Sequence, residues 1–231
     1  MSSDDVHIWC ASLEQPDGRV HRLAQTLSGD EMARAERFRF EGDRRRFIVS
    51  RGVLRAILGQ YLGIEPSHLN FSYGQHGKPS LAAGFGGDAL RFNLAHSHEL
   101  ALYAFTRGRE VGVDLERVRP LPDAGEIAAR FFSRRENAEL EGIPDCRKLE
   151  AFFTYWTCKE AYIKATGDGL ARNLDQVEVS LAPGPARLLS VGGALEEAAR
   201  WSLLAMNPAS GYVAAVAFEG HRCQLGLWQW T

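Results

Sequence analysis

Two carboxylates alternate along one short segment of this sequence. Asp114 and Glu116 belong to the run VGVDLE at residues 111–116, and a strand places both on one face with apolar side chains opposite. Adjacent like charges repel unless a cation lies between them. Carboxylate oxygens suit Mg²⁺, which keeps several waters and binds substrate phosphate. The alternative is a solvated strand end whose carboxylates face Arg117 and Arg119.

A second acidic candidate lies on a helix predicted over residues 149–166, with Gly167 as its C-cap. Trp156, Glu160 and Lys164 are four residues apart and therefore share one face. Glu160 could join the two strand carboxylates. The simpler interpretation is a surface Glu–Lys pair worth about 0.2–0.5 kcal/mol.

His96 and several arginines could reach a ligand. His96 follows a predicted strand over residues 91–95, where a rigid element supports it; the alternative is a hydrogen-bonded turn residue. Eight arginines and four acids lie between residues 31 and 55, and Arg46 and Arg51 are the candidates for phosphate because a guanidinium binds it with two donors. A solvated helix face is the alternative.

Several common catalytic motifs do not occur. The sequence has no Gly-x-Ser-x-Gly elbow, so hydrolysis by a Ser/His nucleophile is disfavoured. It also has neither a Gly-x-x-x-x-Gly-Lys-Ser/Thr loop nor a Gly-x-Gly-x-x-Gly turn. Side chains must therefore hold any bound phosphate.

The pattern of elements predicts an α+β fold. Capping boxes at Ser28–Glu31 and Ser133–Glu136 mark helix starts. The predicted helices span residues 28–39, 43–62 and 149–166, and the predicted strands span residues 6–13, 69–73, 91–95, 101–106, 111–116, 177–181, 201–206, 212–218 and 223–230. We expect the last four strands to form an antiparallel meander. Each half runs from helix to sheet, which suggests two similar halves.

Composition limits the class of protein. The 231 residues are 45% hydrophobic and 24% charged, enough for one large core or two small ones. A net charge of -2 offers no field that would attract nucleic acid or a membrane. No apolar run approaches the roughly 18 residues of a membrane span, and the acidic start at residues 1–5 is unlike a signal peptide, so we expect a cytoplasmic protein. The four cysteines form no CxxC pair, which indicates reduced thiols.

Five segments in order resemble the 4'-phosphopantetheinyl transferases of the surfactin-synthetase-activating (Sfp) type. The strongest are Gly112–Glu116, similar to the family's Gly-Ile/Val-Asp-x-Glu strand, and Trp156–Gly167, similar to its Trp-Ser/Thr-x-Lys-Glu helix. The weaker segments are Gly77–Pro79, Phe92–Ser97 and Arg130–Ser133 with Glu136. The family often has Ser where this chain has Ala95, so a hydroxyl contact to the donor is absent there.

The resemblance implies two halves, 1–110 gripping coenzyme A and 111–231 binding metal, related by a pseudo-twofold axis with the active site in the cleft between them. It implies transfer of the 4'-phosphopantetheine group from coenzyme A to a serine of an acyl or peptidyl carrier protein, with release of adenosine 3',5'-bisphosphate. Mg²⁺, or Mn²⁺ as an alternative, would bind the acidic trio. The implied metal ligands are Asp114, Glu116 and Glu160, and the implied donor-binding residues are Arg46, Arg51, Lys78, His96, Lys159 and Lys164.

Among these residues, Glu160, Lys164 and His96 are the expected catalytic ones. Glu160 would accept the serine proton directly or through water, with Glu136 as a weaker candidate base. A docking surface for the carrier is predicted at Leu121, Pro122, Ile127 and Phe131, and the alternative for the last two is the buried stripe of a short helix. A monomer is the simplest expectation.

Two other functions compete. A Mg²⁺-dependent pyrophosphohydrolase acting on coenzyme A or a nucleotide would need the same metal and phosphate ligands. A silent module that binds coenzyme A or a carrier protein is the third hypothesis, and the intact acidic trio disfavours it. The carrier's pathway, whether siderophore, polyketide, peptide or fatty-acid synthesis, stays open.

Overall fold

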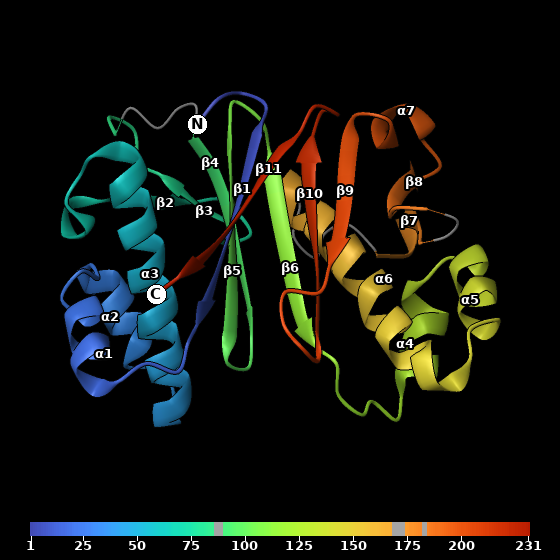
Figure 1. The fold of residues 1–231 in the computed structure, drawn as a ribbon, viewed down its shortest axis with the longest axis horizontal. Coiled ribbons are helices and arrows are strands. Elements are labelled where there is room, and N and C mark those ends of the chain that lie inside the picture. Colours follow the sequence, from blue (N-terminus) through green and yellow to red (C-terminus); the bar gives the residue numbers. More distant parts are fainter. Residues whose placement is uncertain (86–89, 168–173, 182–183) are drawn as a thin grey trace.

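The computed structural model describes residues 1–85, 90–167, 174–181 and 184–231 (Figure 1). The elements of the first half are β1 (Asp5–Ser12), α1 (Asp17–Ala24), α2 (Gly29–Ala35), α3 (Glu41–Leu62), the 3₁₀ turn η1 (Pro66–His68), β2 (Phe71–Tyr73), β3 (Pro79–Leu81), β4 (Leu90–Ser97) and β5 (Leu100–Arg107). Those of the second half are β6 (Val111–Arg117), α4 (Ala124–Phe131), α5 (Arg134–Glu141), α6 (Asp145–Thr166), η4 (Leu174–Gln176), β7 (Val177–Ser180), β8 (Arg187–Val191), α7 (Leu195–Ala198), β9 (Trp201–Met206) and β10 (Tyr212–Glu219), followed by β11 (Gln224–Trp230).

Two main sheets form the centre of the molecule. The first has the strand order β11-β1-β5-β4 and the second has β6-β10-β9. All neighbours in these sheets are antiparallel except β11, which runs parallel to β1. The two sheets share one strand order. In β1-β5-β4 the last strand of the first half lies between the first and the next-to-last strand, and in β6-β10-β9 the strand before β11 lies between the corresponding strands of the second half. The expected fold of two similar α+β halves is confirmed.

Each half places one long helix on the outer side of its sheet. In Figure 1, α3 lies outside the first sheet and α6 outside the second, with the two sheets between them. Strand alternation explains these layers, because Val6 and Ile8 join a core cluster with Val113 and Val216 of the other sheet. Residues of opposite parity, such as Ala11, pack on the α3 side instead.

Local sequence signals set the limits of the helices. Both capping boxes form, and α3 and α6 end at Gly63 and Gly167, whose positive φ values of 66° and 76° suit glycine. The predicted end of α2 at Arg39 is wrong, because the helix stops at Ala35. The chain must be extended at Phe40, with φ -105° and ψ 134°, to start α3 in a new direction.

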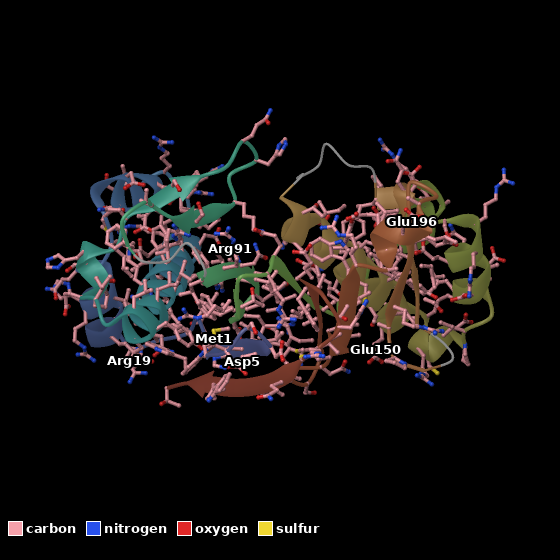
Figure 2. All side chains as sticks on the ribbon, turned by 90° about the horizontal axis from the view of Figure 1, so that it is seen from above. Met1, Asp5, Arg19, Arg91, Glu150 and Glu196 are labelled. Carbon is pink, nitrogen blue, oxygen red and sulfur yellow. The ribbon has the colours of Figure 1, made fainter. Side chains whose placement is uncertain are left out.

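The predicted four-stranded meander at the C-terminal end is wrong. Both edges of β10 are occupied, by β6 and β9, so β11 has no edge to join there. It instead joins the first sheet beside β1, where Gln224 lies opposite Asp5. Figure 2 shows the C-terminal strand passing next to the labelled Asp5. β7 pairs with β8 in a separate two-stranded sheet. The division into 1–110 and 111–231 stays a prediction, with β11 crossing it.

Candidate active site

Asp114 and Lys164 meet where β6 packs against α6. Asp114 Oδ1 lies 2.6 Å from Lys164 Nζ, while the buried Asp114 Oδ2 has no side-chain or backbone partner among the residues that the structure describes. Gly112 permits this approach, because a Cβ there would lie 2.1 Å from the Ala161 carbonyl oxygen in the backbone of α6. The strand therefore contacts the helix closely enough for side chains of both to form one site.

The charge of Asp114 influences the ionisation of Glu116 and Glu160. Burial raises the pKa of Asp114, against the lowering effect of Lys164. Burial also raises the pKa of Glu116 and of Glu160, and the negative charge of Asp114 adds to both shifts. Asp114 therefore shares one electrostatic environment with Glu116 and Glu160.

The acidic trio is not assembled as a ready-made metal cluster. Within the described ranges, no group of three His, Cys, Asp or Glu side chains could hold a metal ion. Lys164 takes the place of a cation at Asp114 Oδ1. The unpartnered Asp114 Oδ2 and the mutual repulsion of the carboxylates are nevertheless the conditions that a divalent cation relieves, so these residues fit Mg²⁺.

A pocket of about 210 Å³ lies beside Lys164, between the two halves. Its lining from the first half is His76, Gly77, Lys78, Pro79, Asn93 and Leu94, and from the second half Ile163, Lys164 and Gly167. Residues from both halves therefore face one cavity next to the Asp114–Lys164 pair, which matches the expected cleft.

Lys78 is held by protein atoms within this region. Its Nζ donates to the Ala165 carbonyl at 2.8 Å, to Glu110 at 3.1 Å and to the Val111 carbonyl at 3.4 Å. Arg91 also contacts Glu110, at 3.0 Å. A phosphate at Lys78 would have to replace one of these partners.

His96 and Arg46 lie near the site from the first half. His96 is exposed overall, but nearby protein atoms partly exclude water from its ring, which lowers its pKa, and the positive charges of Lys164 and Arg46 lower it further. Arg46 is part-exposed and makes ion pairs with Asp43 at 3.3 Å and Glu14 at 3.5 Å. Both residues remain accessible to an anion.

Arg51 does not have the accessible position expected of a donor ligand. It is buried, and it donates to Glu31 Oε1 at 2.7 Å and to the Tyr73 hydroxyl at 2.8 Å. Arg55 approaches the other oxygen of Glu31 at 2.6 Å. The capping-box carboxylate of α2 thus anchors two cations of α3, which gives Arg51 a structural contact rather than a ligand.

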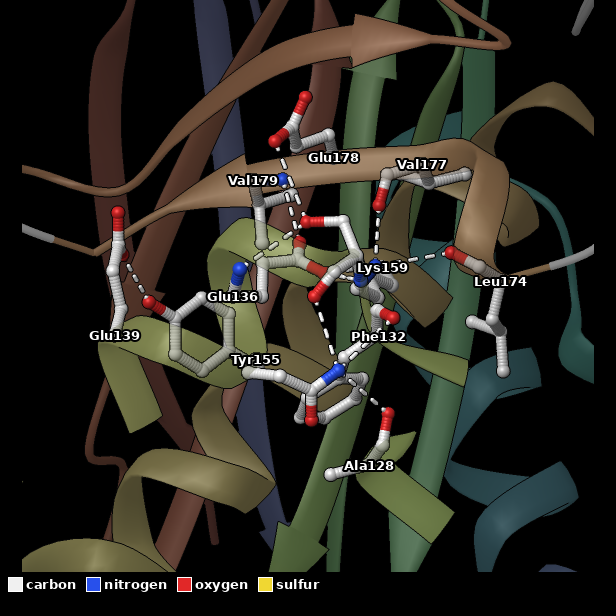
Figure 3. A network of polar contacts seen from close by, with 12 residues as sticks. Ala128, Phe132, Glu136, Glu139, Tyr155, Lys159, Leu174, Val177, Glu178 and Val179 are labelled. Atoms are coloured by element: carbon white, nitrogen blue, oxygen red, sulfur yellow. Dashed lines mark hydrogen bonds and ion pairs between the residues drawn. The ribbon is translucent and has the colours of Figure 1, made fainter. Parts of the chain in front are cut away.

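Lys159 also differs from its expected role, as Figure 3 shows. It is 0% exposed and donates to Glu136 at 2.7 Å and to the carbonyls of Leu174 at 3.0 Å and Val177 at 2.5 Å. Its three donors are satisfied by protein, so none remains for coenzyme A. Glu136, also 0% exposed, accepts from Val179 N at 2.8 Å and cannot reach a substrate proton.

The predicted docking residues lie on and before α4. Pro122 is exposed, and Leu121, Ile127 and Phe131 are half-buried against the core of the second half. The Phe131 ring meets the Trp156 ring edge-on, with centroids 5.9 Å apart. Part of each apolar side chain packs inward and part remains on the surface.

The sequence reasoning missed Asn93 and Ser97, which contact β6. Asn93 Oδ1 accepts from Val113 N at 2.9 Å. Ser97 Oγ donates to Glu116 Oε2 at 3.1 Å. Both belong to the segment that yielded His96, so a strand period applied to the whole segment would have placed Asn93, Ala95 and Ser97 on one face.

Comparison with known proteins agrees with this geometry. The profile described as 4'-phosphopantetheinyl transferase superfamily matches residues 110–217, and that of 4'-phosphopantetheinyl transferase, N-terminal, matches residues 14–107. The chain is 48% identical to the 4'-phosphopantetheinyl transferase HetI of Nostoc sp. over 99% of this chain and 93% of that one. It is 37% identical to a putative 4'-phosphopantetheinyl transferase of Synechocystis sp. (74% and 68% covered) and 29% identical to Sfp of Bacillus subtilis (69% of each). The chain belongs to the 4'-phosphopantetheinyl transferase family.

Proposed function

We propose that this chain transfers the 4'-phosphopantetheine group of coenzyme A to a serine of an acyl or peptidyl carrier protein. The observation that carries this proposal is the buried Asp114 beside Lys164, with one carboxylate oxygen unpartnered, at the edge of a pocket lined by both halves. The names of its relatives, HetI and Sfp among them, support the same group transfer.

The chemistry requires one bond to form and one to break. The serine oxygen bonds to the phosphorus of the pantetheine phosphate, and the phosphoanhydride bond breaks to release adenosine 3',5'-bisphosphate. Glu160, on the same face of α6 as Lys164, takes the serine proton directly or through water. Lys164 contacts the transferred phosphate, and His96 and Arg46 bind the donor's other phosphates.

Asp114, Glu116 and Glu160 would hold Mg²⁺, or Mn²⁺ in its place. The bound ion would neutralise charge on the pyrophosphate and act as a Lewis acid. Lys164 then has a second role, because its ammonium partly neutralises Asp114 when the ion is absent.

Among the described residues no helix has the length and apolarity to cross a membrane. The four cysteines are free, which supports a cytoplasmic setting, and we expect a monomer.

The direct test is incubation with coenzyme A, Mg²⁺ and an apo carrier protein, followed by mass spectrometry of the carrier. A mass gain equal to the phosphopantetheine arm is expected. Cleavage of coenzyme A with an unmodified carrier would instead indicate a pyrophosphohydrolase, and binding without cleavage a silent module. Glu160→Gln should abolish transfer with the fold intact, and full activity in that variant would refute the proposed site.

A second test concerns the carrier. The exposed parts of Leu121, Pro122, Ile127 and Phe131 would contact its helix. Ile127→Glu should raise the KM for the carrier and leave that for coenzyme A unchanged, provided that circular dichroism shows a folded protein. Equal changes in both values would argue for damage to the fold instead.

A further inference from the structure

The strand that carries the acidic pair has a free edge. Among the strands that the structure describes, β6 is the outermost of its sheet and is hydrogen-bonded to β10 on one side only. The N–H and C=O groups on the other side need partners, because an unpaired buried backbone group costs stability. Here those partners come from side chains of the first half.

Three first-half residues cover this edge. Lys78 Nζ lies 3.4 Å from the Val111 carbonyl, Asn93 Oδ1 accepts from Val113 N at 2.9 Å, and Ser97 Oγ accepts from Arg117 N at 3.2 Å. The positions 111, 113 and 117 share parity, as expected if their polar groups point away from β10. Side chains thus replace a missing neighbour strand.

Ser97 makes two side-chain contacts more than Asn93, to Glu116 and to His98. Its hydroxyl accepts from Arg117 N, and its single proton has two acceptors within reach, Glu116 Oε2 at 3.1 Å and His98 Nδ1 at 3.4 Å. The carboxylate is the nearer of the two and can only accept, so the proton goes to Glu116. The residue is buried, and the β-strand fixes its backbone. One hydroxyl therefore ties both the main chain of β6 and the carboxylate of Glu116 to β4.

We propose that Ser97 is a positioning residue that sets the orientation of the Glu116 carboxylate for metal binding, with Asn93 fixing the strand beside it. The inference rests on the proposed function, in which Glu116 is a metal ligand. Carboxylate ligands are commonly oriented by hydrogen bonds from residues behind them, and loss of such a partner typically costs about 10–100-fold in metal affinity or activity. Because Ser97 is one residue from His96, a single strand would serve both the donor and the metal.

Mn²⁺ binding measured by electron paramagnetic resonance, with coenzyme A present, tests this role without any turnover. Ser97→Ala should weaken Mn²⁺ binding about 10-fold or more. Ser190→Ala is the matched control, because Ser190 Oγ also donates to a strand glutamate, Glu178 at 3.2 Å, in another sheet. The control should bind Mn²⁺ as the wild type does.

A pair of isosteric variants separates the hydroxyl from packing. Ser97→Thr keeps the hydroxyl donor and should retain near wild-type Mn²⁺ affinity. Ser97→Val has the shape of the Thr variant without the hydroxyl, so its Mn²⁺ affinity should be as low as that of Ser97→Ala. In steady-state assays the Ala and Val variants should need more metal for half-maximal rate, with an unchanged KM for coenzyme A. This comparison holds even if Ser97→Ala folds poorly.

The outcomes distinguish the two proposals. Wild-type Mn²⁺ affinity in both Ser97→Ala and Ser97→Val would overturn the positioning role and leave the proposed function standing. Equal losses in the Thr and Val variants would also overturn it, because packing alone would then explain the effect. A wild-type protein that takes up no Mn²⁺ would refute the proposed metal function and this inference with it.

Discussion

Replacing Glu136 by Gln should be among the most destabilising single changes of a carboxylate in this chain. Glu136 and Lys159 are 0% exposed and 2.7 Å apart, so neutralising the acid leaves an ammonium buried with only carbonyls. Removing one partner of such a pair costs about 3–5 kcal/mol. The Gln amide N–H₂ would also face a donor, because Glu136 accepts from Val179 N at 2.8 Å and Ser133 N at 2.6 Å. The loss is a large share of a typical stability of about 5–15 kcal/mol.

Urea unfolding followed by circular dichroism measures this loss. Glu139→Gln is the matched control on the same helix, because Glu139 is partly exposed and pairs with Arg135 at the surface. It also accepts from the Tyr155 hydroxyl, a bond that the Gln carbonyl can keep, so we expect a loss under about 1 kcal/mol. Adding Lys159→Met to Glu136→Gln should cost less than the sum of the single changes. A loss below about 1 kcal/mol for Glu136→Gln, or strict additivity, would refute the account of a coupled buried pair.

Three further outcomes are expected. Asp114→Asn should lower the transfer rate at least about 100-fold at an unchanged melting temperature or higher, measured with saturating Mg²⁺. Gly112→Ala should destabilise by about 1–3 kcal/mol or more, seen as a lower urea midpoint, because its Cβ meets the backbone of α6. The pKa of His96 is lowered by the partial exclusion of water from its ring and by two cations, so the imidazolium becomes the main form only below about pH 6.5. The KM for coenzyme A should therefore fall as the pH drops below that value, and should not do so in His96→Ala.

Local signals predicted the elements well where the chain itself supplies the cause. The capping boxes, the αL glycines Gly63 and Gly167 and the apolar periodicity of α3 act within a few residues, so they can be recognised without tertiary contacts. Strand pairing could not be predicted from local sequence in the same way. Nothing local to β11 says that β10 already has two neighbours, and hence that the last strand must join β1.

The same division holds for the site. The period of two placed Asp114 with Glu116, and the period of 3.6 placed Glu160 with Lys164, because each pair lies within one element. The sequence could not predict which of the lysines is available to a ligand. Sequence treats Lys159 and Lys164 alike, yet they point to opposite environments, one to buried Glu136 and the other to Asp114 at the pocket.

What the sequence determined by itself was therefore the family and the strand and helix that carry the acidic residues, while the metal chemistry of the trio stays a prediction. The tertiary structure decided which cations are available to a ligand, since burial and prior partners can only be known once helices and sheets pack. It also decided that Asn93 and Ser97 cover the free edge of β6. Contacts between residues 20 positions apart on different sheets leave no periodic trace in the sequence.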